Sequence, residues 1–273
     1  LGYVVEYKII NAGEYGLPQK RKRVFICAYL KTSNYAKGAL SLSSSHSIEQ
    51  FVETDGILFG AFNGQVLKSH DTIVIPTGKK TKKALLNSLL TLEDEFPSLK
   101  QSPFGNAGIV INGIVHPFKT QSKSSKRVRS LRSVLVKEED VDAEFYVPDL
   151  KLWKWKHYRG AKKIARIKPN GEEYIFTEGA MQLFDDLSKP GRTIITSEGG
   201  PGASRTKHLI KRGKRQRRLV PVELERMNQF PDNHTNLEGV GHSKRAFLMG
   251  NALVVGVVER IRDELIRRND SIL

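Results

Sequence analysis

The first 30 residues constrain the fold most, because two apolar segments there are joined by one short polar loop. Residues 3–10 alternate apolar and polar side chains, and residues 24–29 are almost continuously apolar. Residues 11–23 between them are polar and basic, with glycines and a proline that favour turns. The pattern predicts a strand, a basic loop and a second strand. We expect the second strand to lie in a sheet covered on both faces, where uninterrupted apolar runs are usual.

The charge balance limits the kinds of partner. Lys and Arg number 45 against 29 Asp and Glu, which gives a formal net charge of +16. Such an excess favours a polyanionic partner, and nucleic acid is the first candidate because each neutralised phosphate releases counterions. An anionic membrane is the alternative, but no apolar run approaches the about 20 residues of a spanning helix. The basic residues are also scattered instead of lying on one amphipathic face.

The cysteine content and the start of the chain bear on its compartment. Cys27 is the single cysteine, so disulfides within the chain are impossible and a reducing cytoplasm fits best. The first residues lack the charged-then-apolar order of a signal peptide. The chain starts at Leu1, without a methionine and close to a predicted strand. We expect a fragment of a longer parent, with a processed or trimmed chain as the alternative.

Local patterns predict most of the remaining elements. These are a loop at 33–48, short antiparallel strands at 55–67 and 72–77 with a hairpin at 58–64, a helix at 85–92, and a hairpin at 108–117. Asn112-Gly113 would supply the tight turn of the last hairpin. Pro221 would open a helix, where its missing N–H costs nothing. Residues 253–268 have apolar side chains at helical spacing, which predicts a final helix.

The basic loop contains the most specific motif. Asn11-Ala12 is followed by Tyr15-Gly16-Leu17-Pro18 and then by Gln19, Arg21 and Arg23. Two arginines two residues apart on a loop can point the same way and make bidentate contacts to phosphate or a base edge. From the spacing alone, a solvated basic turn is the favoured interpretation.

The stretch resembles the motif of DNA (cytosine-5-)-methyltransferases in which Gln-x-Arg-x-Arg follows Asn-Ala and Tyr-Gly-x-Pro. In that family these side chains line the pocket for the flipped cytosine. The resemblance therefore implies that Arg23 holds the target cytosine and that Arg21 contacts the base and its phosphate. Gln19 would be a supporting hydrogen-bonding residue.

A second stretch, residues 217–232, is similar to the family's element Arg-x-Leu-Thr-Pro-x-Glu-x-x-Arg-x-x-Gly-Phe-Pro. Val220 replaces the usual Thr and Gln229 the usual Gly, which puts the backbone geometry around Phe230 in doubt. The element's role in the family is mainly structural. Glu223 and Arg226 are three residues apart, a spacing that allows them to pair on a helix.

A third stretch, Gly250-Asn251-Ala252-Leu253, resembles the family's last motif, where the chain completes the S-adenosylmethionine pocket. The resemblance implies that Asn251 and Ala252 are cofactor-side residues at a helix N-terminus. Gly-Asn before a helix is common, and it is the order after the other two stretches that makes the match specific.

The middle of the chain, residues 30–212, falls where the family places its variable target-recognition region. Arg192-Thr193-Ile194, followed by a glycine cluster and by Ser204 and Arg205, resembles the recognition-loop pattern with its Thr-Leu or Thr-Ile pair. Glycines let backbone approach DNA closely, and arginine can bind guanine in the major groove. We therefore expect Arg192, Thr193, Ser204 and Arg205 to contact DNA. The cluster is not a P-loop, since no Gly-Lys-Ser/Thr follows it.

Aromatic residues and a further likeness refine the middle region. Trp153 and Trp155 could stack on bases, but alternating aromatics more often pack one face of a strand, so we expect core positions. Ser102-Pro103-Phe104, Asn106-Ala107-Gly108 and the run at 160–163 resemble enzymes that modify GGNCC or GGWCC sites.

The family's nucleophile is missing from the sequence. The resemblance implies attack of a cysteine thiolate, carried by a Pro-Cys motif, on cytosine carbon 6, with a glutamate of a Glu-Asn-Val motif assisting. Neither motif occurs in this chain. Cys27 follows Ile26 in an apolar strand, where a buried thiol is inert. The seven histidines show no metal-ligand spacing, so we expect no metal.

We therefore expect an α/β chain: the C-terminal part of a Rossmann-like S-adenosylmethionine-dependent methyltransferase fold plus a mixed, strand-rich target-recognition domain. Residues 1–30 would supply the last catalytic strands, 31–240 the recognition domain, and 241–273 the helix that returns to the catalytic domain.

The expected function is recognition of a duplex DNA site and help in methylating carbon 5 of a flipped cytosine, in a restriction–modification system of the bacterial cytoplasm, associated with the nucleoid. The expected partners are double-stranded DNA and an N-terminal half that carries the nucleophile, without which we expect the chain to be inactive. The alternatives are a stand-alone DNA-binding protein and a basic RNA-binding protein.

Overall fold

The computed structural model describes residues 2–75, 103–123, 125, 127–168 and 171–270. The chain divides into two compact units. Unit 1 comprises Leu1–Tyr15, Lys22–Ser125 and Val258–Leu273, and unit 2 comprises Gly16–Arg21 and Lys126–Val257. These limits differ from the predicted boundaries after residues 30 and 240. The functional assignment of the three predicted segments stays a prediction.

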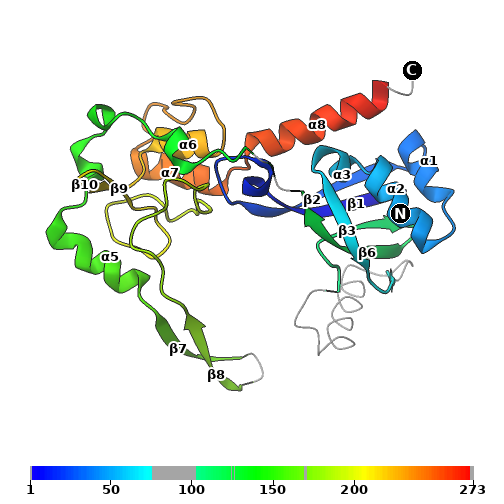
Figure 1. Cartoon of the computed structure of the whole chain (residues 1–273), viewed down its shortest axis with the longest axis horizontal. Helices are drawn as coiled ribbons and strands as arrows, with labels where there is room; N and C mark the ends of the chain where they lie inside the picture. The colour runs from blue at the N-terminus through cyan, green and yellow to red at the C-terminus, as the bar shows by residue number, and fades with distance from the viewer. Residues whose placement is uncertain (1, 76–102, 124, 126, 169–170, 271–273) are drawn as a thin grey trace. The chain divides into compact units, whose positions relative to one another are not determined.

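Unit 1 is built on a six-stranded antiparallel sheet (Figure 1), with the order β2-β1-β5-β6-β3 and with β4 paired to β6. Its strands are β1 (Tyr3–Asn11), β2 (Lys22–Leu30), β3 (Gly64–Ser69), β4 (Ile73–Val74), β5 (Ala107–Ile111) and β6 (Ile114–Ser122). β1 and β2 pair along their whole length, from Tyr3 opposite Leu30 to Asn11 opposite Lys22. The predicted strand, loop and strand are therefore confirmed.

The turn between β5 and β6 also agrees with the prediction. Asn112 and Gly113 have φ angles of 51° and 83°, so both occupy the left-handed region. Two such residues in a two-residue loop match the twist of an antiparallel hairpin, and Asn-Gly is the pair that adopts them most easily. The predicted hairpin at 108–117 is confirmed.

Three helices cover one face of the sheet (Figure 1): α1 (Asn34–Leu40), α2 (Ser45–Asp55) and α3 (Ile57–Ala61). Their apolar residues pack with the inward side chains of the strands; this core contains Val4, Ala36, Ala39, Ile48, Val52, Phe59, Val66, Ala107, Ile109, Ile111 and Phe118. The predicted loop at 33–48 was wrong, because Ser33 and Ser44 are N-caps that start helices. The strand predicted from residue 55 and the hairpin at 58–64 were wrong for the same segment, where α3 precedes β3.

The opposite face of the sheet is open at β2, the strand at the end of the order. Val24, Ile26 and Leu30 are 57%, 65% and 56% exposed, while Phe25, Cys27 and Tyr29 on the helix side are half-buried. The expectation that this strand is covered on both faces was therefore wrong for the described chain. Burial raises the pKa of the Cys27 thiol, as expected for an unreactive cysteine.

Unit 2 has little regular structure in its core. It contains the helices α5 (Leu152–Arg159), α6 (Pro221–Met227) and α7 (His242–Asn251), the hairpins β7 (Lys162–Ile167) with β8 (Glu173–Glu178) and β9 (Ile210–Arg212) with β10 (Arg215–Arg217), and the 3-10 turns η2 (Leu131–Val134), η3 (Glu138–Asp140), η4 (Ala143–Phe145) and η5 (Asp149–Lys151). The largest apolar cluster joins η2, α6 and α7 around Ile194. The mixed α/β composition of the predicted fold is confirmed.

The helices of unit 2 and the last helix of the chain agree with the predictions in part. Pro221 is the first residue of α6, as predicted. The last helix, α8 (Val255–Asp270), confirms the helix predicted at 253–268, with both ends shifted by two residues. Trp153 and Trp155 lie on α5 and not on a strand; Trp155 is buried, as expected, whereas Trp153 is 62% exposed. The helix predicted at 85–92 lies outside the described residues. α7 was not predicted.

Candidate functional site

The basic loop between β1 and β2 is fixed to the interior of unit 2 by Gln19. Its side chain is fully buried. The carboxamide oxygen accepts the N–H of Ile194 at 3.0 Å, and the carboxamide nitrogen donates to Oδ1 of Asn228 at 2.8 Å. The backbone joins this arrangement, since Lys20 donates its N–H to the Gly191 carbonyl at 2.7 Å. Gln19 therefore supports the loop, with every contact made to protein.

Arg21 is buried beside it and connects two distant stretches of the chain. Its guanidinium donates to the Ile194 carbonyl at 2.8 Å and to the Gly250 carbonyl at 2.9 Å. Asn228 adds a bond from its amide nitrogen to the Met249 carbonyl at 2.9 Å. We call Gln19, Arg21, Ile194, Asn228 and Gly250 the motif cluster.

The close packing of the motif cluster depends on Gly250. A Cβ at this position would lie 2.5 Å from the backbone of Ile195 and Thr196, which no side chain tolerates without a shift. The glycine of the third stretch is thus needed for the approach of two backbones. That Arg21 also contacts a base stays a prediction; in the structure its guanidinium bonds to two carbonyls of the protein.

Arg23 differs from Arg21 in its element, its burial and its hydrogen bonds. It lies on β2 in unit 1 and is exposed. The one hydrogen bond recorded for it within the described residues goes from its guanidinium to the neighbouring Lys22 carbonyl, at 2.8 Å. Its remaining N–H groups can therefore meet a ligand, and its role at the target cytosine stays a prediction.

The second family-like stretch is held by a fully buried ion pair. Both terminal nitrogens of Arg217 donate to Glu223 at 2.8 Å, and Nε donates to Glu138 at 3.1 Å. Glu223 also accepts the N–H of Val220 at 3.0 Å, which closes the first turn of α6. The predicted pair of Glu223 with Arg226 was wrong, because the buried Arg217 takes both carboxylate oxygens.

Gln229 stands where the family usually has glycine, and its backbone explains that preference. Its φ angle is 63°, a left-handed conformation that costs a side chain about 1 kcal/mol. The side-chain oxygen accepts the N–H of Gly256 at 3.2 Å near the start of α8, which offsets part of this cost.

Asn251 and Ala252 lie between two helices. Asn251 is the last residue of α7, it is exposed, and its amide donates to the Phe247 carbonyl at 3.3 Å. Ala252 is half-buried against the apolar cluster of unit 2. The expectation of a helix N-terminus was wrong, because α8 begins only at Val255. Their contact with a cofactor stays a prediction.

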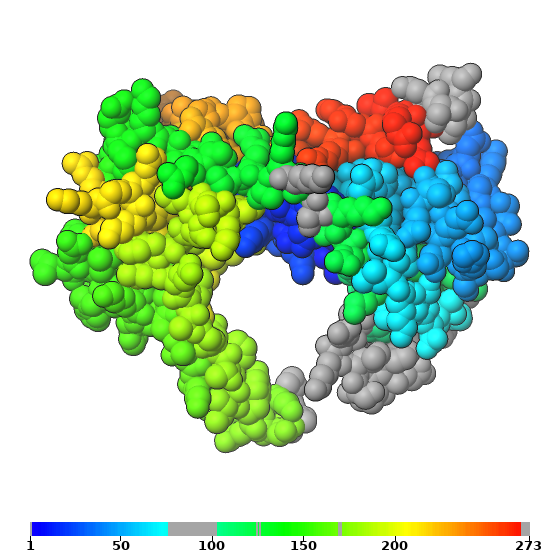
Figure 2. All heavy atoms as spheres, in the orientation of Figure 1, coloured from blue at the N-terminus to red at the C-terminus, as the bar shows by residue number. Residues whose placement is uncertain are grey.

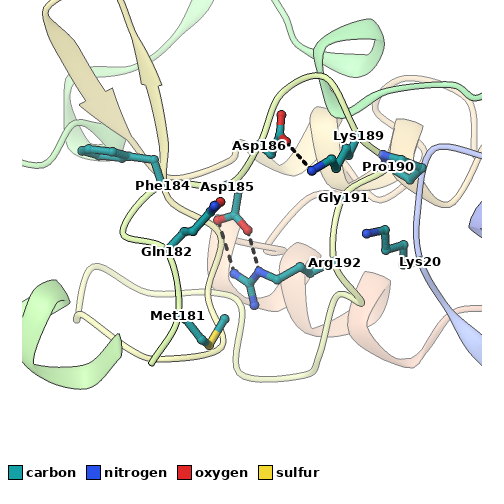
Figure 3. Close-up of a pocket in the computed structure, with 10 residues that line it drawn as sticks. All are labelled: Lys20, Met181, Gln182, Phe184, Asp185, Asp186, Lys189, Pro190, Gly191 and Arg192. Carbon is teal, nitrogen blue, oxygen red and sulfur yellow. Dashed lines mark hydrogen bonds and ion pairs between the residues drawn. The ribbon is translucent and has the colours of Figure 1, made fainter. Parts of the chain in front are cut away.

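A pocket of about 270 Å³ in unit 2 lies beside the predicted DNA contact Arg192 (Figure 3). Lys20, Phe184, Asp185, Lys189 and Arg192 are among its lining residues, and Figure 3 shows the carboxylate of Asp185 facing the guanidinium of Arg192. The guanidinium also donates to the Lys207 carbonyl at 2.9 Å. Most of its donors are thus already engaged.

Asp185 organises this side of unit 2. It pairs with Arg159 at 3.2 Å and accepts the N–H of Leu209 at 2.9 Å. Burial alone would raise the pKa of Asp185, but the charges of His208 and of the two arginines bring it down to about 2. The carboxylate is therefore ionised at neutral pH and fixes both arginines.

The other predicted DNA contacts lie in different surroundings. Thr193 donates its hydroxyl to the Lys20 carbonyl at 2.5 Å, and the Ser204 hydroxyl lies 3.0 Å from that of Thr206. Arg205 binds main-chain carbonyls at the ends of the β7–β8 hairpin. The structure thus places Arg192 and Thr193 beside the motif cluster and the pocket, and Arg205 at the hairpin. Their contacts with DNA stay predictions.

Two groups of buried polar residues were missed by the sequence argument. Asn228 lies inside the second family-like stretch, at a position for which that stretch gave no role. Asp185 and Arg159 form an ion pair across 26 positions of the sequence, with the β7–β8 hairpin between them, and no periodicity marks such a pair. The described residues contain no group of three or more His, Cys, Asp or Glu that could hold a metal ion. None of the helices in the described ranges combines the length and apolarity needed to cross a membrane.

The motif cluster joins three stretches that occur in the order of a nucleic-acid methyltransferase, on a strongly basic α/β chain. The model of the family described as C-5 cytosine-specific DNA methylase matches residues 1–267, and the chain belongs to this family.

Two curated relatives give the scale of the match. The chain is 35% identical over 272 residues to the type II methyltransferase M.Sau3AI of Staphylococcus aureus, covering all of this chain and 60% of that protein. It is 59% identical over 34 residues to the type II methyltransferase M.MthTI of Methanothermobacter thermautotrophicus, covering 12% of this chain and 10% of that protein. The chain therefore spans at most about 60% of the length of these relatives.

Among solved structures, the chain resembles the Dnmt2 methyltransferase of S. pombe, with a TM-score of 0.47 and 12% identity over 97% of this chain and 56% of that one. The methyltransferase EhMeth of Entamoeba histolytica gives a TM-score of 0.44 and 11% identity, over 97% and 55%.

Proposed function

We propose that this chain is the C-terminal, DNA-recognising part of a type II DNA (cytosine-5-)-methyltransferase. It recognises a specific duplex site and helps to transfer a methyl group to carbon 5 of a cytosine flipped out of the helix, as chemistry on a stacked base requires. The motif cluster is the observation that carries the proposal. Gln19 and Arg21 of the basic loop bond to residues 173 to 229 positions further along, inside the other two family-like stretches or at the isoleucine of the Thr-Ile pair.

The two arginines of the loop have separate tasks in this proposal. Arg21 is a positioning residue, since its guanidinium holds the carbonyls of Ile194 and Gly250. Arg23 is exposed and has N–H groups to offer, so it takes the part of holding the target cytosine. Gln19 keeps the loop in place through Ile194 and Asn228.

The cofactor is S-adenosylmethionine, whose sulfonium supplies an electrophilic methyl group when it is bound. Asn251 fits a small part of such a site, because its carboxamide is exposed at the end of α7 and its oxygen has no partner recorded in the described residues. Ala252 adds a small half-buried surface next to it. This chain would complete the pocket, and the remainder would come from the portion that carries the nucleophile.

The partner that carries the nucleophile would meet the sheet of unit 1 at β2. Among the residues that the structure describes, this strand ends the sheet, so one row of its backbone N–H and C=O groups has no partner strand there. Val24, Ile26 and Leu30 add exposed apolar side chains on its open face. The sequence lacks a Pro-Cys motif. Residues 1–30 then continue the catalytic sheet, residues 31–240 form the target-recognition region, and residues 241–273 return to the catalytic domain.

DNA recognition would use Arg192, Thr193, Ser204 and Arg205, with a GGNCC or GGWCC type of site as the first to test. The setting we propose is a restriction–modification system in the cytoplasm of a bacterium, at the nucleoid.

The test combines this chain with a methyltransferase portion that carries Pro-Cys, and measures transfer of labelled methyl groups from S-adenosylmethionine to duplex DNA. We expect transfer from the mixture, and none from either part alone. An inactive mixture in which this chain still binds duplex DNA would leave the stand-alone DNA-binding protein as the answer.

A variant pair then tests the role of Arg23. Arg23→Ala should lower methyl transfer by about a hundredfold, the scale on which a lost transition-state contact acts, with DNA binding changed only a few-fold. Lys22→Ala is the matched control, because Lys22 is the neighbouring exposed cation on the same strand. Equal activity of the two variants would refute the assignment of Arg23.

A further inference from the structure

The hairpin formed by β7 and β8, called the arm below, is a two-stranded ribbon that leaves the rest of unit 2 (Figures 1 and 2). Its strands pair only with each other among the described residues. Both faces are open to solvent: Ile164 and Tyr174 on one face are 39% and 37% exposed, and Ile167 and Ile175 on the other are 69% and 67% exposed.

Such a ribbon gains little stability from itself, since an isolated two-stranded hairpin is marginal in water. Its ends, however, are firmly held by one side chain. Arg205 donates to the Gly160 carbonyl at 2.9 Å before β7 and to the Gly179 carbonyl after β8, and its Nε lies 3.4 Å from the Glu178 carboxylate. The roots of the arm are therefore fixed while its strands project into solvent. Exposed apolar surface on a firmly attached hairpin is typical of a binding site.

The charge of the arm and of α5 in front of it indicates what that surface binds. Between Lys151 and Glu178 the sequence has eight Lys and Arg against three Asp and Glu; of the eight, Arg159 is buried in its ion pair with Asp185 and Lys168 pairs with Glu172, so six remain. Two of the acids are already neutralised, because Glu172 pairs with Lys168 and Glu178 with Arg205. The side chains of Lys163 and Arg166 are exposed on opposite faces of the ribbon. A polyanion that contacts both cations must therefore have negative charge on both sides of the ribbon.

The shape of the arm fits a groove of duplex DNA. The major groove admits a two-stranded β-ribbon, and its thymine methyl groups offer contacts to aliphatic side chains. We propose that the arm enters the major groove of duplex DNA. Ile167 and Ile175 face the base edges, and Lys163 on the same face binds a phosphate at the rim of the groove. Lys162 and Arg166 extend from the opposite face and bind phosphates of the groove walls. This inference rests on the proposed function, because it adds a contact element to the same DNA-recognising part.

A second copy of this chain is the competing occupant of the apolar face. Charge disfavours it, since two arms with the same excess of cations repel each other. Aromatic side chains next to the arm agree with a nucleic acid partner as well: Trp153 and Tyr158 on α5 are 62% and 42% exposed.

The test is the salt dependence of binding to a duplex oligonucleotide, measured with the whole 273-residue chain and with a triple variant, Lys162→Gln, Lys163→Gln and Arg166→Gln. Each lost phosphate contact lowers the slope of log affinity against log salt by about 0.9. We expect the slope to fall by about 2 to 3 and the affinity to fall at least about tenfold at low salt. The matched control removes three exposed cations of unit 1, through Lys37→Gln, Lys68→Gln and Lys119→Gln.

The outcomes separate the arm from the proposed function. An unchanged slope in the arm variant, or an equal loss in the control, would overturn the role of the arm while DNA recognition by the chain stands. If the unmodified chain does not bind duplex DNA, the proposed function itself fails. A further variant, Ile167→Ser with Ile175→Ser, should weaken binding without a change of slope; if it instead dissolves a dimer seen in sedimentation, the apolar face binds a second copy.

Discussion

The motif cluster and the arm use the same kinds of basic residue in opposite ways. In and around the cluster, Arg21 and Arg217 are buried, and each donates to partners within the protein. On the arm, Lys163 and Arg166 are exposed, and no ion pair is recorded for either among the described residues. The excess of positive charge is therefore not one surface property. Part of it holds unit 2 together, and part of it is available to a polyanion.

The difference teaches that two arginines of one family motif can lie in opposite surroundings, one buried and one exposed. Arg21 and Arg23 are two residues apart in one motif, yet one is 3% exposed inside unit 2 and the other is exposed on a strand of unit 1. Stability and DNA binding should therefore respond to different sets of substitutions, and the comparison can be tested on that basis.

The largest effect is expected at Arg217. Arg217→Ala would leave the carboxylate of Glu223 buried without its partner, and breaking a buried ion pair costs about 3 to 5 kcal/mol. The free energy of unfolding by urea measures this. Arg215→Ala, at an exposed position two residues earlier, is the control and should cost less than about 1 kcal/mol.

The next effect separates the two arginines of the loop. Arg21→Ala removes two hydrogen bonds from a charged donor and should lower the free energy of unfolding by about 2 to 3 kcal/mol. Arg23→Ala should change it by less than about 0.5 kcal/mol, because the side chain is exposed. Similar losses from both variants would contradict the separation of their roles.

A pH dependence of about 2 kcal/mol is expected from Asp185. Its pKa is lowered from 3.8 to about 2 in the folded chain. The ionised carboxylate thus stabilises the fold above about pH 4, and this contribution disappears as the pH falls through about 2. The difference in unfolding free energy between the unmodified chain and Asp185→Asn should therefore shrink to about half between pH 6 and pH 3. A difference that does not vary with pH would mean that Asp185 acts by packing alone.

The smallest effect on stability is expected from the arm. The triple variant at Lys162, Lys163 and Arg166 should change the free energy of unfolding by less than about 0.5 kcal/mol, since none of these side chains is fully buried. A fall of several kcal/mol in the free energy of unfolding would show that these cations stabilise the fold, as Arg21 and Arg217 do, and would contradict the difference between the arm and the motif cluster.

Much of the fold could be predicted where one residue fixes the backbone. Asn112-Gly113 sets a tight turn, Pro221 starts a helix, and the apolar spacing after residue 253 predicts α8. The prediction failed in residues 33–61, where serine caps and short helices have the same composition as a loop. The burial of β2 was overestimated, because an apolar run indicates that a strand can be covered on both faces but does not show that the described chain covers it.

The candidate site was predicted in part, for a related reason. The three family-like stretches include Gln19, Arg21 and Gly250, and the structure brings these residues together around Ile194 and Asn228, a contact that the sequence did not predict. Sequence order cannot say which of two nearby arginines is buried, because that depends on carbonyls more than 170 residues away. The Asp185–Arg159 pair has no pattern to reveal it. Nor could the sequence show that, within the described ranges, β7 and β8 pair with no third strand.

The hydrogen bonds from Arg205 to the two ends of the arm have a consequence for how its sequence can change. Arg205 binds the carbonyls of Gly160 and Gly179, which any residue at those positions would also supply. The sequence and length of β7 and β8 can therefore change without a change in the core of unit 2. With the arm in its proposed role at DNA, this attachment would let a lineage acquire a new target site while the core of unit 2 stays unchanged.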